Sequence, residues 1–242
     1  MLKFYTLRSA RDIFCHIILI LLPILLISFF SYIYSRYNIA AVTPLLTIGF
    51  ALTFQIYGSA LSFETLGQDF LSPMRNRLLA TPANPVKIVL SILFSGIIVS
   101  FLQTFVVLIF SATILDIKFN NLFLILLVML ISVVFNQLFG SIILFLSKNV
   151  KTANSVTTLY GIVAPILAGL YFPLPDNIII NLFEKYLTPM ALAQTAILGV
   201  MDNNLKNIAI GTIPLIILSL ILFLLIKPLS KKVILWLYLN MH

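Results

Sequence analysis

Residues 122–147 read LFLILLVMLISVVFNQLFGSIILFLS and contain no Asp, Glu, Lys or Arg. A run of about 20 apolar residues is enough for an α-helix to cross a hydrocarbon core of roughly 30 Å. Within lipid the backbone has to satisfy its own hydrogen bonds, so a stretch of this kind is expected to be helical. The stretch therefore predicts a membrane-spanning helix.

Further apolar stretches flank this one along the chain. Hydrophobic residues make up 61% of the sequence and charged residues 9%, and the mean hydropathy is +1.14. The charges lie near the ends, in the connections or at the edges of the apolar stretches. These values exclude a soluble domain. They predict an all-α, polytopic membrane protein of one domain (1–242) with six transmembrane helices, at residues 13–34, 40–63, 86–110, 122–147, 152–171 and 207–226.

The basic residues predict the orientation of these helices. If residues 1–12 form a cytoplasmic entry segment and the spans alternate, four basic residues fall outside: Arg36, Lys118, Lys185 and Lys206. The other eleven of the 15 fall inside, as in most membrane proteins with short loops. The net charge of +8 is therefore a topology signal with some attraction to anionic lipid, and not a sign of nucleic-acid binding. It predicts a multi-pass protein with both termini cytoplasmic.

The predicted cytoplasmic connection, residues 64–85, contains signals that bound a short helix. Ser72-Pro73 is a start signal, because serine caps free N–H groups and proline suits the first helical position. Thr81-Pro82 is a stop signal, because the residue before proline is pushed out of the α region. Together they predict a helix over residues 72–80. The same apolar spacing, continued backwards, predicts a first short helix over residues 64–71.

The predicted helix at residues 72–80 has one apolar face. Met74 and Leu78 lie four residues apart and share this face, while Arg75, Asn76 and Arg77 point elsewhere. One interpretation is an amphipathic helix that rests on membrane lipid. The other is a docking helix that presents its basic residues to a cytoplasmic partner. The two interpretations are compatible.

The predicted outer connection, residues 172–206, combines helix breakers with apolar residues. Asp176 or Asn177 is able to cap a helix over 178–187, and Thr188-Pro189 repeats the cap-plus-proline signal before a second helix that ends at Gly199. Each helix has about 10 residues and spans roughly 15 Å, half the hydrocarbon thickness. We therefore expect an outer, re-entrant hairpin that dips into the leaflet or packs on the bundle.

Four amide side chains lie within the predicted spans: Gln55, Gln103, Asn136 and Gln137. Each amide needs hydrogen-bond partners in a region without water. One interpretation is that they bond neighbouring helices together. The other is that some of them line a translocation path.

The sequence lacks the residue patterns of several other kinds of site. It has no G-x-x-x-x-G-K-[ST] segment to hold a triphosphate. One Cys and two His give no metal-ligand spacing, and no nucleophile–base constellation is apparent. No charged residue lies in the middle of a predicted span, which argues against a proton-driven pump. We expect no catalytic, cofactor or metal residue here, so energy has to come from another chain.

The order of the predicted elements and two local motifs resemble the ABC-2 type permeases, the membrane subunits of bacterial ABC exporters. Residues 75–82, RNRLLATP, look like the family's basic R-L-L-A-T-P segment after the second span. Residues 171–175, YFPLP, followed by LTP at 187–189, look like its F-P-x-x-x-L-P…P region. The acidic and basic run that precedes the cytoplasmic helix in the family is reduced here to Glu64 and Asp69.

The resemblance implies a multi-pass protein of the bacterial cytoplasmic membrane. It implies assembly with a second permease copy, identical or homologous, and with two ABC ATP-binding subunits that hold ATP and Mg²⁺. It also implies that the cytoplasmic helix couples ATP hydrolysis to helix movement. By position, the coupling residues are Ser72, Met74, Arg75, Asn76, Arg77 and Leu78.

Substrates in the resembling family include drugs, antimicrobial peptides, lipids and lipid-linked glycans. The short chain, which has no large soluble insertion, fits an exporter of a drug-like, peptide or lipid-type substrate best. A lipid-linked glycan or haem-type export subunit is an alternative that only substrate data separate. From a different class, a channel would show ion flux without ATP, and a membrane-embedded enzyme would need the catalytic constellation that the sequence lacks.

Overall fold

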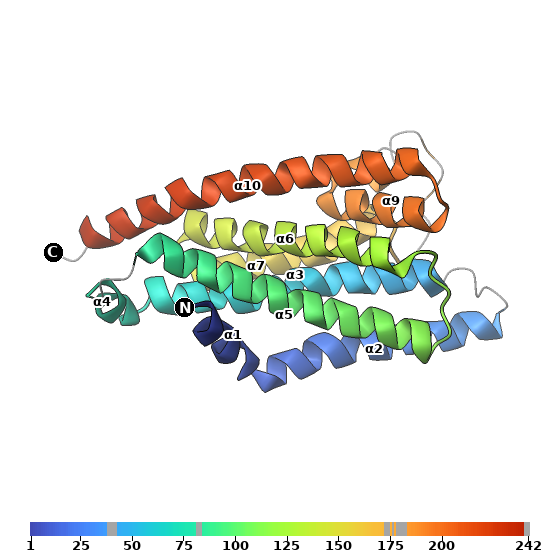
Figure 1. Ribbon diagram of the computed structural model, residues 1–242, viewed down its shortest axis with the longest axis horizontal. Coiled ribbons are helices and arrows are strands. Elements are labelled where there is room, and N and C mark those ends of the chain that lie inside the picture. Colours follow the sequence, from blue (N-terminus) through green and yellow to red (C-terminus); the bar gives the residue numbers. More distant parts are fainter. Residues whose placement is uncertain (38–42, 81–83, 172–174, 176, 178–182, 240–242) are drawn as a thin grey trace.

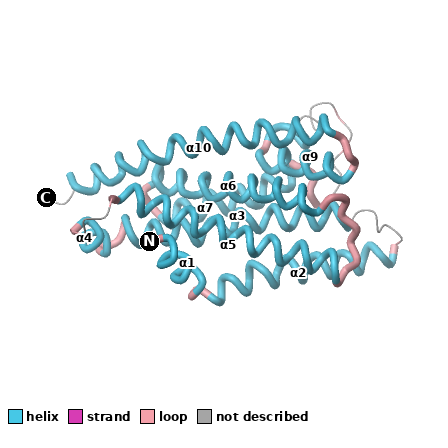
Figure 2. The backbone as a smooth tube through the Cα atoms, viewed as in Figure 1, coloured by secondary structure: helices cyan, strands magenta, loops and turns pink. Residues whose placement is uncertain are grey.

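The computed structural model describes residues 1–37, 43–80, 84–171, 175, 177 and 183–239, and within these ranges the chain is all helical. The long helices are α2 (Ile13–Arg36), α3 (Thr43–Phe70), α5 (Pro85–Thr113), α6 (Leu122–Ser147) and α10 (Leu205–Leu239). The shorter elements are α1 (Leu2–Ala10), α4 (Met74–Leu79), α7 (Val150–Leu167), a π-helical turn η2 (Phe183–Leu187) and α9 (Pro189–Met201). Figures 1 and 2 show the long helices running along one axis.

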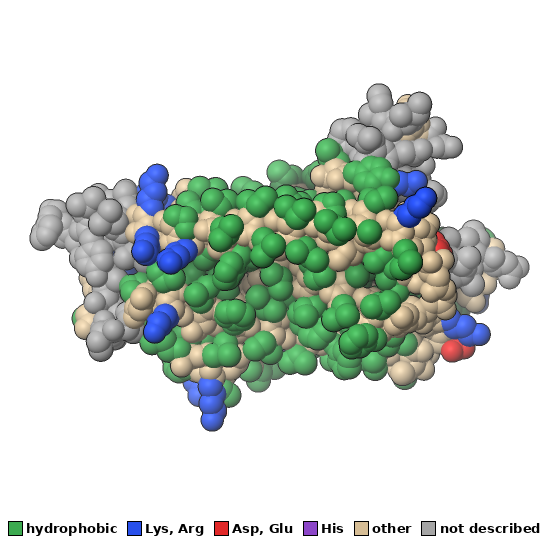
Figure 3. Space-filling model, turned by 45° about the horizontal axis from the view of Figure 1, so that its top comes forward, with side chains coloured by type: hydrophobic (Ala, Val, Ile, Leu, Met, Phe, Trp, Pro, Cys, Tyr) green, Lys and Arg blue, Asp and Glu red, His purple; other side chains and the backbone are tan. Residues whose placement is uncertain are grey.

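The helices form a bundle around α3. In its most apolar window, 72% of the α3 residues are buried, against 50% for α5 and α6, 17% for α10 and 11% for α2. The outer helices therefore expose apolar side chains, which suits contact with lipid. Figure 3 shows this as a band of hydrophobic side chains with Lys and Arg toward its two ends. Such a surface is what a bundle immersed in a bilayer requires.

The two ends of the bundle differ. Figure 1 shows α1, α4 and the end of α10 gathered at one end, called here the α4 end. The opposite end, called the α9 end, carries α9 and the connection between α5 and α6. The first and last described helices, α1 and α10, thus both reach the α4 end of the bundle. That the α4 end faces the cytoplasm stays a prediction.

Six spans were expected, and the structure supports five. Among the described residues, α2, α3, α5, α6 and α10 are long and apolar enough to cross a membrane. The α7 helix has 18 residues and is not among them, because its first half carries the polar residues Lys151, Thr152, Asn154 and Ser155. The sixth span, expected over residues 152–171, is therefore not confirmed.

Several predicted boundaries also differ from the structure. Helix α6 covers residues 122–147, as the sequence predicts. Helix α3, expected to end at residue 63, runs on to Phe70, so residues 64–70 continue this helix and do not form a separate short one. Helix α10, expected over 207–226, extends from Leu205 to Leu239. Hydropathy marks the part of a helix that contacts lipid, and a helix is free to continue beyond that part into water.

Polar side chains cap the starts of several helices. The side-chain oxygen of Asn84 accepts from the Val86 N–H at the start of α5, and that of Asn149 accepts from the Lys151 N–H at the start of α7. The Thr188 hydroxyl accepts from the Ala191 N–H, followed by Pro189 at the first position of α9. The cap predicted from Thr188-Pro189 is thus confirmed, although α9 continues through Gly199 to Met201. Each such cap contributes about 1 kcal/mol to helix stability.

The outer connection is described only in part. Helix α9 is largely buried and packs against α10 and α6, so it lies on the bundle. Gly211 of α10 allows this approach, because a Cβ there would lie 2.3 Å from the Leu192 carbonyl oxygen and 2.6 Å from the Ala196 nitrogen. Most of the first predicted outer helix, 178–187, lies outside the described residues. The re-entrant hairpin is therefore not confirmed.

Candidate functional site

The predicted coupling helix exists as α4, a short helix at the α4 end of the bundle. Ser72 caps it, because its Oγ accepts from the Met74 N–H at 3.1 Å. Met74 is 51% exposed, Asn76 is exposed and Arg75 is half-buried. The side chains of Arg77 and Leu78 lie outside the described part. A two-turn helix with exposed polar and apolar residues is able to dock against another protein, and its coupling role stays a prediction.

A partly buried ion pair anchors the helix that precedes α4. Asp69 lies in the last turn of α3 and its side chain is 3% exposed. One carboxylate oxygen accepts from the Arg8 guanidinium of α1 at 2.7 Å, and the other accepts from the Tyr5 hydroxyl at 2.9 Å. The second terminal nitrogen of Arg8 donates to the Gln68 side-chain oxygen at 3.0 Å. The structure thus joins α1 to the end of α3 through side chains 60 or more residues apart in the sequence.

Tyr5 is held in its neutral, donating form. Burial raises the pKa of its phenol, and the negative charge of Asp69 raises it further. Tyr5 therefore donates to Asp69 throughout the physiological pH range. Because the raised pKa favours the protonated phenol, this contribution is fully present below the ordinary tyrosine pKa and is lost only as the pH rises through the folded value.

Gln137 connects three helices in the interior. It projects from α6, and its amide nitrogen donates to the Ser100 hydroxyl of α5 at 2.7 Å. The same nitrogen lies 3.3 Å from the Gly96 carbonyl of α5 and 3.4 Å from the Gly58 carbonyl of α3. The two glycines let the backbones approach, because a Cβ on Gly96 would lie 2.6 Å from the Gln137 side-chain oxygen. The contacts favour the interpretation of Gln137 as a link between helices.

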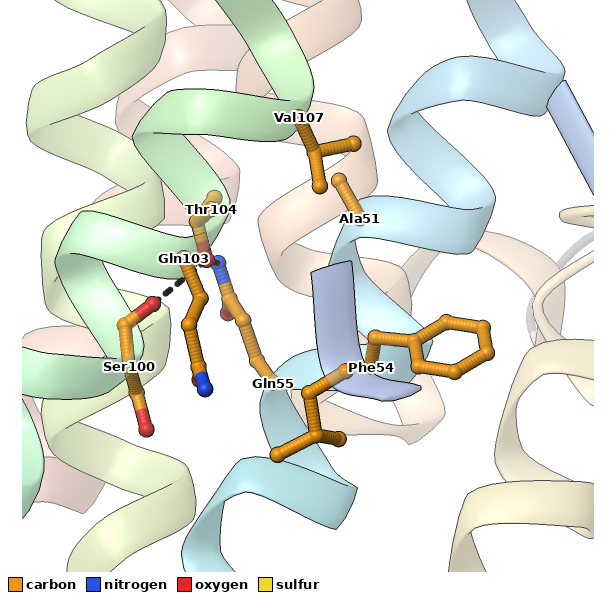
Figure 4. A pocket seen from close by; sticks show the side chains of 8 residues that line it. Ala51, Phe54, Gln55, Ser100, Gln103, Thr104 and Val107 are labelled. Atoms are coloured by element: carbon orange, nitrogen blue, oxygen red, sulfur yellow. Dashed lines mark hydrogen bonds between the residues drawn. The ribbon is translucent and has the colours of Figure 1, made fainter. Parts of the chain in front are cut away.

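Gln55 and Gln103 lie on either side of a small cavity between α2, α3 and α5. Gln55 reaches from α3 to the Thr104 hydroxyl at 3.3 Å, as Figure 4 shows. The Gln103 amide donates to His16 Nδ1 at 2.8 Å, and His16 Nε2 donates to the Ser9 carbonyl. The cavity has about 10 Å³ of free volume, space for one water molecule. The space beside these amides is therefore too narrow for an organic substrate in this conformation.

Asn136 stands apart from the other three amides. It is buried, and its amide nitrogen lies 3.5 Å from the Ser132 hydroxyl, one turn earlier in the same helix. The structure thus brings Gln55, Gln103 and Gln137 to the packed faces of α3, α5 and α6 and leaves Asn136 with a contact inside α6. A role of any of these amides in a translocation path stays a prediction.

A wider groove opens on the other side of α3. It has a free volume of about 460 Å³ and lies between α2 and α7, with α3 behind it. Phe50, Phe54, Tyr57 and Tyr171 line it together with aliphatic residues, and the Tyr171 and Thr53 hydroxyls lie 2.7 Å apart. The groove suits a largely apolar ligand. Sequence reasoning missed it, because aromatic residues in an apolar span do not reveal which side they face.

Sequence reasoning also missed the pairing of Arg8 with Asp69. Asp69, one of two acidic residues that precede the predicted coupling helix, was visible in the sequence, but nothing in the sequence indicates its partner. The burial of Asp69 follows from the continuation of α3 to Phe70, which the hydropathy pattern did not predict. The candidate site therefore consists of α4, predicted from its capping residues, and of an anchor that only the structure shows.

These features define a class of protein: a helical membrane protein with a short, exposed helix at one end and an apolar interior that contains several buried amides. Residues 37–226 match the family described as ABC-2 family transporter protein, and the chain therefore belongs to this family. The resemblance seen in its motifs is thus confirmed over most of its length, and the chain is of the transport-permease class of ABC transporters. No curated protein and no solved structure matches the chain significantly.

Proposed function

We propose that this chain is the permease subunit of an ATP-driven exporter and acts with two copies of a separate ABC ATP-binding subunit. In this proposal ATP and Mg²⁺ bind to the partner, and α4 transmits the partner's movement to the bundle. The chain pairs with a second permease copy, identical or homologous. The observation that carries the proposal is α4 itself, a capped helix at the end of the bundle that bears Met74, Arg75 and Asn76.

The proposed substrate is drug-like, peptide or lipid-type and moves outward across the bacterial cytoplasmic membrane. The groove between α2 and α7 supports this substrate class, because it has room for an organic molecule and is lined by aromatic and aliphatic side chains. Ligand sites of this size are mostly apolar with a few polar groups. Thr53, Tyr57 and Tyr171 supply hydroxyl groups along the groove.

The experiment that tests the proposal reverses the charges of α4. Arg75→Glu/Arg77→Glu should insert into the membrane normally, because both residues lie outside the long apolar helices. Charged hydrogen bonds to a partner contribute roughly 1.5–3 kcal/mol each, so the double variant should lose most of the co-purifying ATP-binding subunit. Arg36→Glu, at the opposite end of the bundle, is the matched control and should retain it. Normal association of the double variant would eliminate these arginines as the docking contact.

A further inference from the structure

We propose that α1 positions the coupling helix: Tyr5 and Arg8 hold the end of α3 and so fix the point from which α4 starts. Arg8, Asp69, Tyr5 and Gln68 are called here the Asp69 cluster. The inference rests on the proposed function of α4, and it assigns positioning roles to Tyr5 and Arg8, which lie on α1.

The Asp69 cluster fixes the position of the Asp69 carboxylate. Both carboxylate oxygens of Asp69 have a side-chain donor, one from Arg8 and one from Tyr5, and the carboxylate is almost fully buried. A buried carboxylate that loses one partner is strongly destabilised, so the pair resists separation. Arg8 is 28% exposed, which leaves its guanidinium at the edge of the bundle and its terminal nitrogens directed at α3.

Three hydrogen bonds, two of them to different groups of Gln68, connect the cluster to α4. Arg8 donates to the side-chain oxygen of Gln68, and the backbone carbonyl of Gln68 accepts from the Ser72 hydroxyl. Ser72 Oγ in turn accepts from the Met74 N–H, the first residue of α4. A shift of α1 therefore reaches the start of α4 through these three hydrogen bonds and through Gln68, which takes part in two of them.

Helix α1 also holds the helix that follows α4. It packs against α5, and Tyr5 lies in an apolar cluster that contains Phe70 of α3 and Ile92 of α5. The crevice between α1, α3 and α5 has only about 10 Å³ of free volume, so the contact is close. Figure 1 shows α1 across these helices near the end that carries α4. The coupling helix α4 thus lies in the chain between α3 and α5, and α1 contacts both of these helices.

One face of α1 is exposed and apolar, and the other contacts the bundle. Phe4 and Leu7 are 63% and 56% exposed, which suits contact with the membrane, while Tyr5 is buried and Arg8 is directed at α3. A helix that only rested on lipid would direct its basic residue toward water or headgroups. The inward direction of Arg8 is explained by the bond to Asp69.

The test uses the complete transporter, purified with its ATP-binding subunit and reconstituted in lipid. The measured quantities are the amount of ATP-binding subunit that co-purifies, the ATPase rate in the presence of the permease, and the melting temperature. Arg8→Asp and Asp69→Arg should each retain the partner, because the surface of α4 is unchanged, but should lower the permease-dependent ATPase rate. The double variant Arg8→Asp/Asp69→Arg restores opposite charges and should recover a rate close to that of the unchanged protein. Coupling between contacting charges of this kind should amount to about tenfold in rate.

Lys3→Asp is the matched control. It makes the same change of charge on α1, but Lys3 is exposed and makes no ion pair with the described residues. The permease-dependent ATPase rate of Lys3→Asp should equal that of the unchanged protein. If the single charge variants fail to insert, Tyr5→Phe keeps the ring in its apolar cluster and removes only the bond to Asp69, and it should lower the rate with the partner still bound.

The outcomes separate this inference from the proposed function. Loss of partner binding in the α4 double variant, with a normal ATPase rate in the Arg8, Asp69 and Tyr5 variants, would overturn the inference and leave the proposed function intact. Normal binding in the α4 variant would eliminate Arg75 and Arg77 as the docking contact, and the inference, which rests on docking through α4, would fall with them. The ATPase rates of the Arg8 and Asp69 variants could also fall only as far as their melting temperatures fall, with no recovery in the charge-exchanged variant. That result would show a merely structural role and would also overturn the inference.

Discussion

Gln137→Leu is expected to loosen the junction of α3, α5 and α6. The substitution keeps a side chain of similar size in a fully buried position and removes the amide that donates toward Ser100, Gly96 and Gly58. The Ser100 hydroxyl loses its closest partner from another helix. If the amide serves as a link between helices, the loss should appear as reduced stability of the permease.

The expected size follows from the number of donors. An amide nitrogen carries two hydrogens, so at most two of the three contacts are made at full strength. Hydrogen bonds between membrane helices contribute on average about 0.6 and at most about 1.7 kcal/mol each, so the substitution should cost roughly 1–3 kcal/mol. For a chain of this size that corresponds to a fall of roughly 3–10 °C in the melting temperature.

The assay is thermal unfolding of the purified permease in a mild detergent. Asn136→Leu is the matched control, because it makes the same kind of change one residue earlier, where the amide contacts only Ser132 of its own helix at 3.5 Å among the described residues. It should change the melting temperature much less than Gln137→Leu. An equal or larger fall in Asn136→Leu would refute the reasoning. An unchanged melting temperature in Gln137→Leu together with lost ATPase coupling would instead favour a role in the translocation path.

Three further predictions concern packing, orientation and energy supply. Gly211→Ala should destabilise the permease by about 1–3 kcal/mol in the same assay, because its new methyl group would meet backbone atoms of α9, such as the Leu192 carbonyl oxygen, which are unable to rotate away; an unchanged melting temperature would contradict the close approach of α9 and α10. In a Cys15→Ser background, an impermeant thiol reagent applied to intact cells should label Asn203→Cys and spare Asn76→Cys, and the reverse pattern would invert the predicted orientation. The purified chain alone should not hydrolyse ATP, and robust hydrolysis in the absence of a partner would disprove the subunit assignment.

Local features of the sequence determined which segments are helices and where several of them begin. The span at residues 122–147 and the cap at Thr188 could be predicted because each depends on a short run of neighbouring residues. The short helix α4 after Ser72 could be predicted for the same reason, since a capping hydroxyl and a proline act on the next few N–H groups. The family could also be inferred, because its motifs are contiguous.

The tertiary structure decided which of these segments are joined and by which residues. The Arg8–Asp69 pair links residues 61 positions apart, and Gln137 meets Gly58 across 79 positions. No local pattern encodes such pairs, because they form only when the bundle closes. The sequence also does not decide whether α7 crosses the membrane, because its polar first half is compatible with a helix in either case. Hydropathy measures the preference of one segment for lipid, whereas the partner of a buried polar group depends on how all the segments pack together.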